Sequence, residues 1–376
     1  MHTPATDLLG IDMPIFAFSH CRDVVAAVTN AGGCGVLGAV AHTPEQLDID
    51  LSWIEDEVKG RPFGVDLLVP GKFAGSDEGG LDRDALAGMV PDAHREWVDG
   101  LLDRYDVPPL PEDVARGLTG NGMNVDPKSM APLLDVVFSH DTKLVASALG
   151  PPPAHFIERA HAGGAVVAAL AGSLDHALRH AEAGADLIVA QGTEAGGHTG
   201  QIATMVLVPE VVDAVAPLPV LAAGGIARGR QLLAGMALGA AGVWCGSVWL
   251  TTEEAETPPA VKEKYLRAGL GDTVRSRSIT GKPARMLRSA WTDAWEADDS
   301  PGTLPMPLQS MLVGAPLARV MRVATKEGSG AQDLATYFVG QVVGSMGTVK
   351  PTRQVVFEMV EEFVDELERL TRLTQD

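Results

Sequence analysis

Eight short apolar runs constrain the fold of this chain more than any other feature. The runs are rich in Val, Ile, Leu and Ala, and five of the seven intervals between their starts measure 21 to 27 residues. None of them alternates apolar with polar residues, a pattern typical of strands that are buried on both faces of a parallel sheet. The runs begin near Pro14, Val36, Phe63, Lys143, Ala165, Asp186, Pro219 and Gly242.

Each of the regular intervals has the length of one strand–helix unit. Small-residue turns at 31–33, 162–164 and 183–185 come just before strands, where the end of a helix needs a residue that tolerates a positive φ. Eight such units favour an α/β fold of the closed (β/α)₈ type, the TIM barrel, over an open doubly wound sheet.

Two parts of the chain exceed what a barrel requires. The third and fourth runs start 80 residues apart, and the segment at about 70–130 is rich in Gly, Pro and acidic residues. We interpret this segment as an insertion on the catalytic face. We predict a barrel over residues 1–250 and a mostly helical extension over 251–376 that packs on it. The extension ends in an amphipathic pattern after Lys350, which predicts an external helix.

Composition excludes several classes of partner. A formal net charge of −20 argues against a nucleic-acid partner. Cys21, Cys34 and Cys245 are isolated in the sequence, so we expect neither a disulfide framework nor a metal site. No apolar run reaches the roughly 18 residues of a membrane span. We therefore expect a cytoplasmic protein without a membrane partner, and assembly into a homo-oligomer is compatible with the sequence.

Two glycine turns, one strand–helix unit apart, form the first candidate site. Gly224-Gly225 end the seventh run, and Gly246-Ser247 end the eighth. The loops after strands 7 and 8 of such barrels often bind a phosphate through bare backbone N–H groups. Ser247 would add a hydroxyl donor. The alternative is that both are ordinary tight turns.

A histidine among glycines forms the second candidate site. His198 closes the sequence EAGGH directly after the sixth run. A titratable imidazole at this rim can sit beside a flat ligand whose approach the glycines permit. We interpret Glu194 as a residue that orients the loop, and His20, after the first run, as a weaker ligand candidate.

Several catalytic motifs are missing. The chain has no Walker A motif, no GxSxG, no HExxH and no GxGxxG at the first strand-to-helix turn. This weighs against a nucleoside triphosphatase, a serine hydrolase, a zinc protease and a Rossmann dehydrogenase.

The assembled motifs resemble those of the nitronate monooxygenases, formerly called 2-nitropropane dioxygenases. The resemblance rests on GTEAGGHTG after the sixth run and on AAGGIA one unit later. MPIFAF, FGVDLLVP, SITGKPARMLR and PLQ add to it, so that it covers most of the chain outside the 70–130 segment.

The resemblance implies an FMN-dependent enzyme that oxidises alkyl nitronates, and by extension nitroalkanes, with O₂. It implies that Ala17–Ser19 line the flavin ring, that Asp66 contacts the cofactor, and that the two glycine turns hold its phosphate. His198 would act as the active-site base or as a hydrogen-bond donor. The full set of cofactor positions is Ala17, Phe18, Ser19, Asp66, Gln191, Gly192, Gly197, Ala223, Gly224, Gly225, Cys245, Gly246 and Ser247.

Two departures keep other functions open. The family commonly has Asn where Asp66 stands, and a GTRF-like run where residues 246–249 read GSVW. The alternative enzyme is a related FMN-dependent NAD(P)H reductase, of the enoyl-acyl-carrier-protein or quinone type. A barrel that only binds a phosphorylated ligand is the non-enzymatic alternative.

Overall fold

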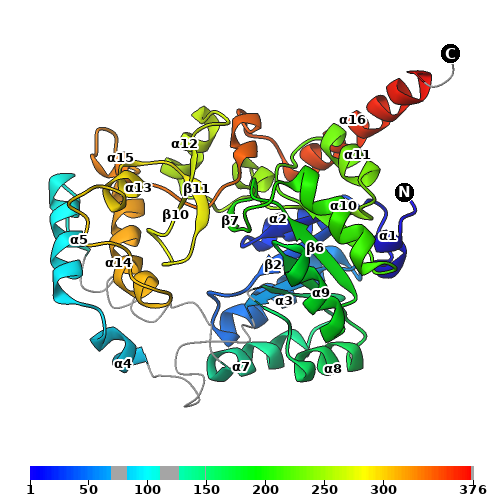
Figure 1. Ribbon diagram of the computed structural model, residues 1–376, viewed down its shortest axis with the longest axis horizontal. Coiled ribbons are helices and arrows are strands. Elements are labelled where there is room, and N and C mark those ends of the chain that lie inside the picture. The colour runs from blue at the N-terminus through cyan, green and yellow to red at the C-terminus, as the bar shows by residue number, and fades with distance from the viewer. Residues whose placement is uncertain (69–82, 111–126, 149, 374–376) are drawn as a thin grey trace.

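A closed barrel of eight parallel strands forms the body of the protein, as predicted (Figure 1). The computed structural model describes residues 1–68, 83–110, 127–148 and 150–373. All eight apolar runs form strands, and β9 pairs with β1 to close the barrel. The strands are β1 (Ile15–Ser19), β2 (Cys34–Gly38), β3 (Gly64–Leu68), β4 (Leu144–Ala148), β5 (Val166–Ala171), β6 (Leu187–Gln191), β8 (Val220–Ala223) and β9 (Gly242–Cys245).

The apolar runs are unbroken because both faces of each strand are covered. Alternate residues such as Phe16 and Val36 fill the barrel interior, whereas their neighbours Ile15 and Leu37 pack outward against the helices. Helix α1 (Pro4–Leu9) closes the end of the barrel that holds the strand N-termini, and Ala5 and Leu9 belong to the interior cluster.

The last described helix completes the ring around the barrel. α16 (Thr352–Leu373) contacts both α11 and α2, so it occupies the place of an eighth barrel helix although it lies about 100 residues after β9. The other ring helices are α2 (Arg22–Asn30), α3 (Pro44–Val58), α7 (Pro127–Val137), α8 (Ala154–Ala162), α9 (Leu174–Ala183), α10 (Thr204–Val215) and α11 (Gly229–Ala237).

The predicted insertion and the predicted extension pack together. α5 (Asp92–Arg104) and α4 (Arg83–Gly88) both contact α14 (Leu308–Val323). The ring centroids of Trp97 and Trp295 lie 4.6 Å apart. The predicted insertion also covers 69–82 and 111–126, which lie outside the described residues. The remaining elements are η2 (Ser247–Thr251), α12 (Pro259–Arg267), α13 (Ala290–Trp295), α15 (Ala331–Leu334) and η3 (Gln341–Ser345).

A small second sheet was not predicted. β7 (Gly197–His198), β10 (Thr273–Ser276) and β11 (Ala284–Leu287) form an antiparallel sheet in the order β10-β11-β7. It joins the loop after β6 to the extension, so the extension reaches the catalytic face of the barrel. β10 and β11 lie beside β7 at the centre of the view in Figure 1.

Candidate functional site

The C-terminal ends of four neighbouring strands bring most of the predicted cofactor positions together. β1 pairs with β9, β9 with β8, and β8 with β6. The register places Ala17 beside Cys245 and Gln191 beside Ala223. Because parallel strands end on one rim, these positions form a continuous arc. Asp66 lies farther along the rim, since β2 separates β3 from β1.

Strand alternation decides which of these side chains can face a ligand. Phe18 packs with the interior cluster, where its ring stacks on Trp244 at 6.5 Å between centroids. Ala17 and Cys245 instead belong to the outer cluster, between strands and helices. These two residues can therefore offer a ligand only backbone atoms, and the Cys245 side chain is a core residue.

The turn after β8 has the backbone conformation that favours glycine. Gly224 has φ +97° and Gly225 has φ +72°. A Cβ added to Gly224 would lie 3.0 Å from the Gly192 carbonyl oxygen, so this glycine also serves close packing. A Cβ added to Gly225 would meet nothing nearer than the Glu194 Cβ, at 3.5 Å. Gly225 thus presents bare backbone on the rim.

The turn after β9 adds a second bare segment and a hydroxyl. A Cβ on Gly246 would find its nearest neighbour, the Phe18 Cδ1, at 3.7 Å. The Oγ of Ser247 accepts a hydrogen bond of 2.8 Å from the backbone N–H of Gly340, which leaves the Ser247 proton free to donate. Two bare turns and a hydroxyl donor on adjacent strands fit a phosphate group. Gly340, in the extension, gave no signal in the sequence.

Glu194 and Gly192 hold the loop after β6 in place. The Glu194 carboxylate accepts hydrogen bonds from the Thr204 backbone N–H, at 3.0 and 3.1 Å, and from the Thr204 hydroxyl at 2.9 Å. It therefore satisfies the first N–H group of α10. A Cβ on Gly192 would lie 2.0 Å from the Thr204 Oγ1, so that position must be glycine. This agrees with the interpretation of Glu194 as an orienting residue.

His198 is held by the small sheet rather than standing free at the rim. It pairs with Ala284, its ring lies 6.3 Å from the Phe338 ring between centroids, and its Nδ1 lies 3.2 Å from the Pro283 carbonyl oxygen. A carbonyl oxygen only accepts, so Nδ1 carries the proton and Nε2 bears the lone pair. Burial lowers the pKa of His198, which favours the neutral, basic form at pH 7.

Two arginines that sequence reasoning missed bracket the histidine loop. Arg285 donates from Nε to the Thr193 carbonyl oxygen at 2.8 Å, and Arg275 donates from Nη2 to the Thr199 carbonyl oxygen at 3.0 Å. The two arginines are cross-strand partners in β10 and β11. They therefore fix both ends of the loop that carries His198. The only sequence signal was the SITGKPARMLR motif, which contains Arg285.

Asp66 carries a buried carboxyl group on the interior side of β3. Its neighbours Val65 and Leu67 pack outward, and the side chain of Asp66 is only 6% exposed. Among the described residues, no side chain or backbone group bonds to this carboxyl. Burial raises its pKa from 3.8 to about 7. The carboxyl group can therefore gain or lose a proton near neutral pH.

The raised pKa of Asp66 predicts a pH-dependent stability. The folded protein binds this proton more tightly than the unfolded chain, so the stabilisation is complete below about pH 4 and is lost as the pH rises to about 7. The free energy of unfolding should therefore fall by at most about 4 kcal/mol over this pH range. We expect the Asp66→Asn variant to show no such fall. Denaturant unfolding at several pH values measures it.

The control is a buried aspartate that has partners. Asp50 lies 2.9 Å from Arg22 Nη1 and 3.0 Å from His42 Nε2, so Asp50→Asn should destabilise the protein at neutral pH. If the stability curves of the wild type and Asp66→Asn run parallel from about pH 4 to 8, the assignment to Asp66 is wrong.

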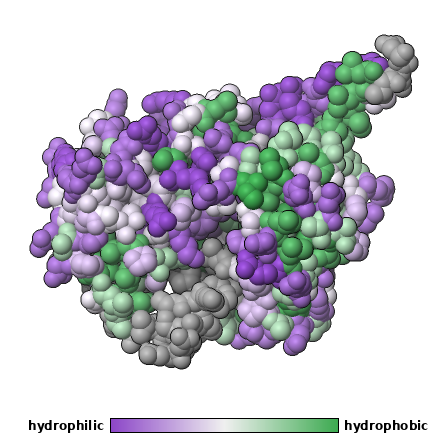
Figure 2. All heavy atoms as spheres, in the orientation of Figure 1, coloured by the Kyte–Doolittle hydropathy of each residue, from purple (hydrophilic) through white to green (hydrophobic). Residues whose placement is uncertain are grey.

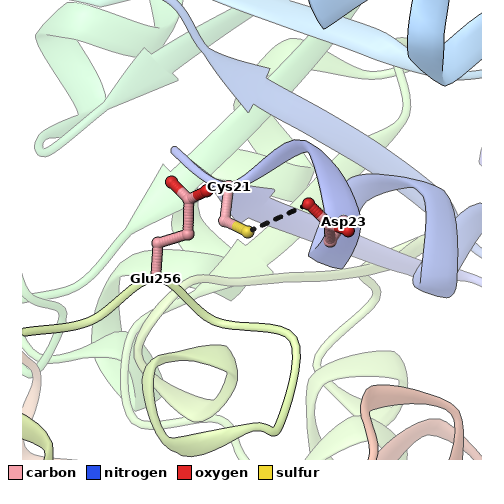
Figure 3. A group of neighbouring side chains, drawn as sticks. All are labelled: Cys21, Asp23 and Glu256. Atoms are coloured by element: carbon pink, nitrogen blue, oxygen red, sulfur yellow. Dashed lines mark hydrogen bonds between the residues drawn. The ribbon is translucent and has the colours of Figure 1, made fainter. Parts of the chain in front are cut away.

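One group of side chains has the composition of a metal site (Figure 3). Ligand atoms of Cys21, Asp23 and Glu256 lie within 4.8 Å of one another. The Cys21 thiol donates to the Glu254 carbonyl oxygen at 3.0 Å, and burial raises its pKa. Three side chains, one of them a thiol already bonded to a backbone carbonyl, do not by themselves define a metal site, so we assign no metal to this group.

Comparisons with known proteins agree with this arrangement. The sequence profile of the nitronate monooxygenase family matches residues 3–362. The chain is 61% identical to Rv1533 of Mycobacterium tuberculosis over the full length of both chains. The name of that relative describes it as a monooxygenase and states no substrate. A second relative from the same organism is a hydroxy-methyl-oxo-octahydroindene-carboxyl-CoA dehydrogenase. The two sequences are 32% identical, over 79% of this chain and 69% of the relative.

Solved structures show the same architecture. The nitroalkane oxidase of Streptomyces ansochromogenes superposes with a TM-score of 0.78 at 25% identity, covering 97% of this chain and 99% of that one. FabK of Thermotoga maritima superposes with a TM-score of 0.73 at 27% identity, covering 99% of each chain. Fold and relatives together define a flavin-dependent oxidoreductase built on a (β/α)₈ barrel. The chain belongs to the nitronate monooxygenase family. Among its described helices, none is long and apolar enough to cross a membrane.

Proposed function

We propose that this enzyme oxidises alkyl nitronates, and the nitroalkanes from which they form, with O₂ and bound FMN. The observation that carries the proposal is the state of His198: the Pro283 carbonyl fixes its proton on Nδ1 and leaves Nε2 as a base on the glycine-rich loop after β6. The oxidation of a neutral nitroalkane begins with removal of a proton from the carbon next to the nitro group, which is the work of such a base.

The residues of the rim have separate roles in this proposal. The backbone of Gly225 and Gly246 and the hydroxyl of Ser247 would hold the FMN phosphate, and Phe18 would pack beside the ring. Bound FMN supplies the route for electrons between substrate and O₂. Nε2 of His198 takes the proton from carbon, and the Nδ1–H bond to Pro283 stabilises the resulting imidazolium. A cytoplasmic location, O₂ as co-substrate, the absence of a nucleic-acid partner and assembly into a homo-oligomer stay predictions.

The similarity to FabK supports a second function, the reduction of flavin by NAD(P)H. An anaerobic experiment separates the two. The purified protein is mixed with NADH or NADPH while the visible absorption of the flavin is followed. An alkyl nitronate is then added, followed by O₂. We expect no rapid bleaching by either nucleotide, and O₂ consumption that depends on the nitronate. Rapid bleaching without nitronate turnover would establish the reductase function instead, and a colourless protein would contradict both.

A further inference from the structure

An apolar stripe runs along the outer side of α16. Phe357, Val360, Val364 and Leu367 recur at intervals of three and four residues, so they lie on one side of the helix. Phe357 is 64% exposed and Leu367 is 45% exposed, although both are large apolar residues. This side borders the face that carries Met359 and Phe363, which is buried against the barrel, and Val360, between the two, packs partly against the core. Exposed apolar stripes of this kind mark interaction surfaces.

The body of the protein holds only the first part of this helix. α11 crosses it so closely that a Cβ on Gly229 would lie 2.1 Å from the Met359 carbonyl oxygen. Arg230 forms ion pairs with Glu362 and with Glu366. Residues 367–373 are all exposed, and the end of α16 projects beyond the body (Figure 1).

The projecting end is itself apolar. Leu370 is 42% exposed and Leu373 is 68% exposed. Leu370 lies seven residues after Phe363, so it continues the face that earlier in the helix is buried on the barrel. Hydrophobic residues also line the projecting end in the space-filling view (Figure 2).

A groove lies at the other end of the same stripe. It encloses about 520 Å³, and Met13, Ala31, Pro351, Phe357 and Val360 are among the residues that line it. The base of α16 forms one wall, and the end of α2 contributes to the other. One molecule therefore presents both an apolar groove and an apolar projection, on a single element.

We propose that two copies of this chain pair antiparallel through α16, about a two-fold axis near residue 362. This register sets Phe357 against Leu367 of the second copy and Val360 against Val364. Residues 351 and 373 lie equally far from the axis, about 16 Å along the helix at 1.5 Å per residue. The projecting end of each copy therefore reaches the Pro351 end of the other copy's groove.

Shape favours a second copy over other occupants, because one element of this chain carries both the apolar groove and the apolar projection. The helix carries six acidic and three basic residues, a balance that an anionic membrane surface would repel. An interface of identical patches is the usual form of a two-fold dimer. Leu370 and Leu373 would lie on the wall that contains Met13 and Ala31.

The oligomeric state tests the proposal. Sedimentation of the intact protein at several concentrations should show a dimer, and Leu367→Glu should weaken dimerisation by roughly thirtyfold or more. Met205→Glu is the matched control, because Met205 is 65% exposed on α10, away from α16. A monomeric wild type, or a dimer that Leu367→Glu leaves intact, overturns the proposal. Circular dichroism verifies that each variant is folded.

Cysteine cross-linking tests the register. The native cysteines are buried, so they do not interfere. Phe357→Cys and Leu367→Cys variants, mixed in equal amounts and oxidised, should form a disulfide-linked heterodimer. Each variant alone should not cross-link, because the antiparallel register separates identical positions by about 15 Å along the helix. Cross-linking of either variant with itself and not with the other would overturn the antiparallel register.

Discussion

Replacing His198 by asparagine should lower turnover of neutral nitroalkanes by roughly 10²–10⁴-fold, the usual contribution of a general base. A nitronate has already lost the proton in question, so its oxidation should be much less affected. The ratio of the two activities is therefore the measurement, and it corrects for any loss of active protein. Flavin content should remain that of the wild type, because His198 has no part in the proposed phosphate site.

The pH dependence of the same variant gives a second measure. Burial lowers the pKa of His198 below its ordinary value of 6.5. Turnover of neutral nitroalkanes should therefore fall only below about pH 6.5, as the imidazole takes up a proton. The pH–rate profile of His198→Asn should lack this fall at low pH. His180→Asn is the matched control, since His180 is also a buried histidine bonded to a backbone carbonyl, that of Leu170. Equal losses with nitroalkane and nitronate would show that His198 binds substrate without acting as a base.

Replacing Gly225 by leucine should empty the cofactor site of a folded barrel. The side chain would fill the space in front of the bare turn, where the phosphate is proposed to bind. We expect the variant to purify without colour and to bind added FMN at least 100-fold more weakly, a loss of about 2.7 kcal/mol. Heat release followed by chromatography of the wild-type cofactor should yield FMN rather than FAD, because the described strands form a barrel and a small antiparallel sheet, with no Rossmann fold among them to hold an adenylate.

The control for Gly225 is a glycine with the same backbone angle. Gly164 also has φ +72° and lies in the turn before β5, away from the rim, with no atom within 4 Å of an added Cβ. Leucine at either position bears the same left-handed strain of about 1–2 kcal/mol. Gly164→Leu should therefore lose stability but keep its flavin. Full flavin occupancy in Gly225→Leu would place the phosphate elsewhere.

Local sequence was sufficient to predict the strands, but not which side chains of each strand point into the barrel. An unbroken apolar run such as residues 187–190 reveals a strand covered on both faces, and this covering is what a barrel provides. The same lack of polar residues hides which positions face inward. Phe18 and Ala17 were therefore equivalent in the sequence, although only Phe18 points into the barrel.

The surroundings of His198 could not be predicted because they come from distant parts of the chain. Its strand β7 has two residues, too short for any periodicity, and its partner β11 lies about 85 residues later. The glycines identified the loop as unusual. They gave no sign of the Pro283 carbonyl that fixes the tautomer, or of the Phe338 ring beside it.

The position of α16 in the ring also affects how the protein is made on the ribosome. When β9 has been synthesised, all eight barrel strands exist, but the sides of α2 and α11 that α16 will cover are still bare. At 5–20 residues per second, the intervening stretch of about 100 residues takes roughly 5–20 s to synthesise. During that time the nascent chain exposes apolar surface between two finished helices. It is then most open to aggregation and to capture by chaperones, and the docking of α16 is the event that completes the ring of helices.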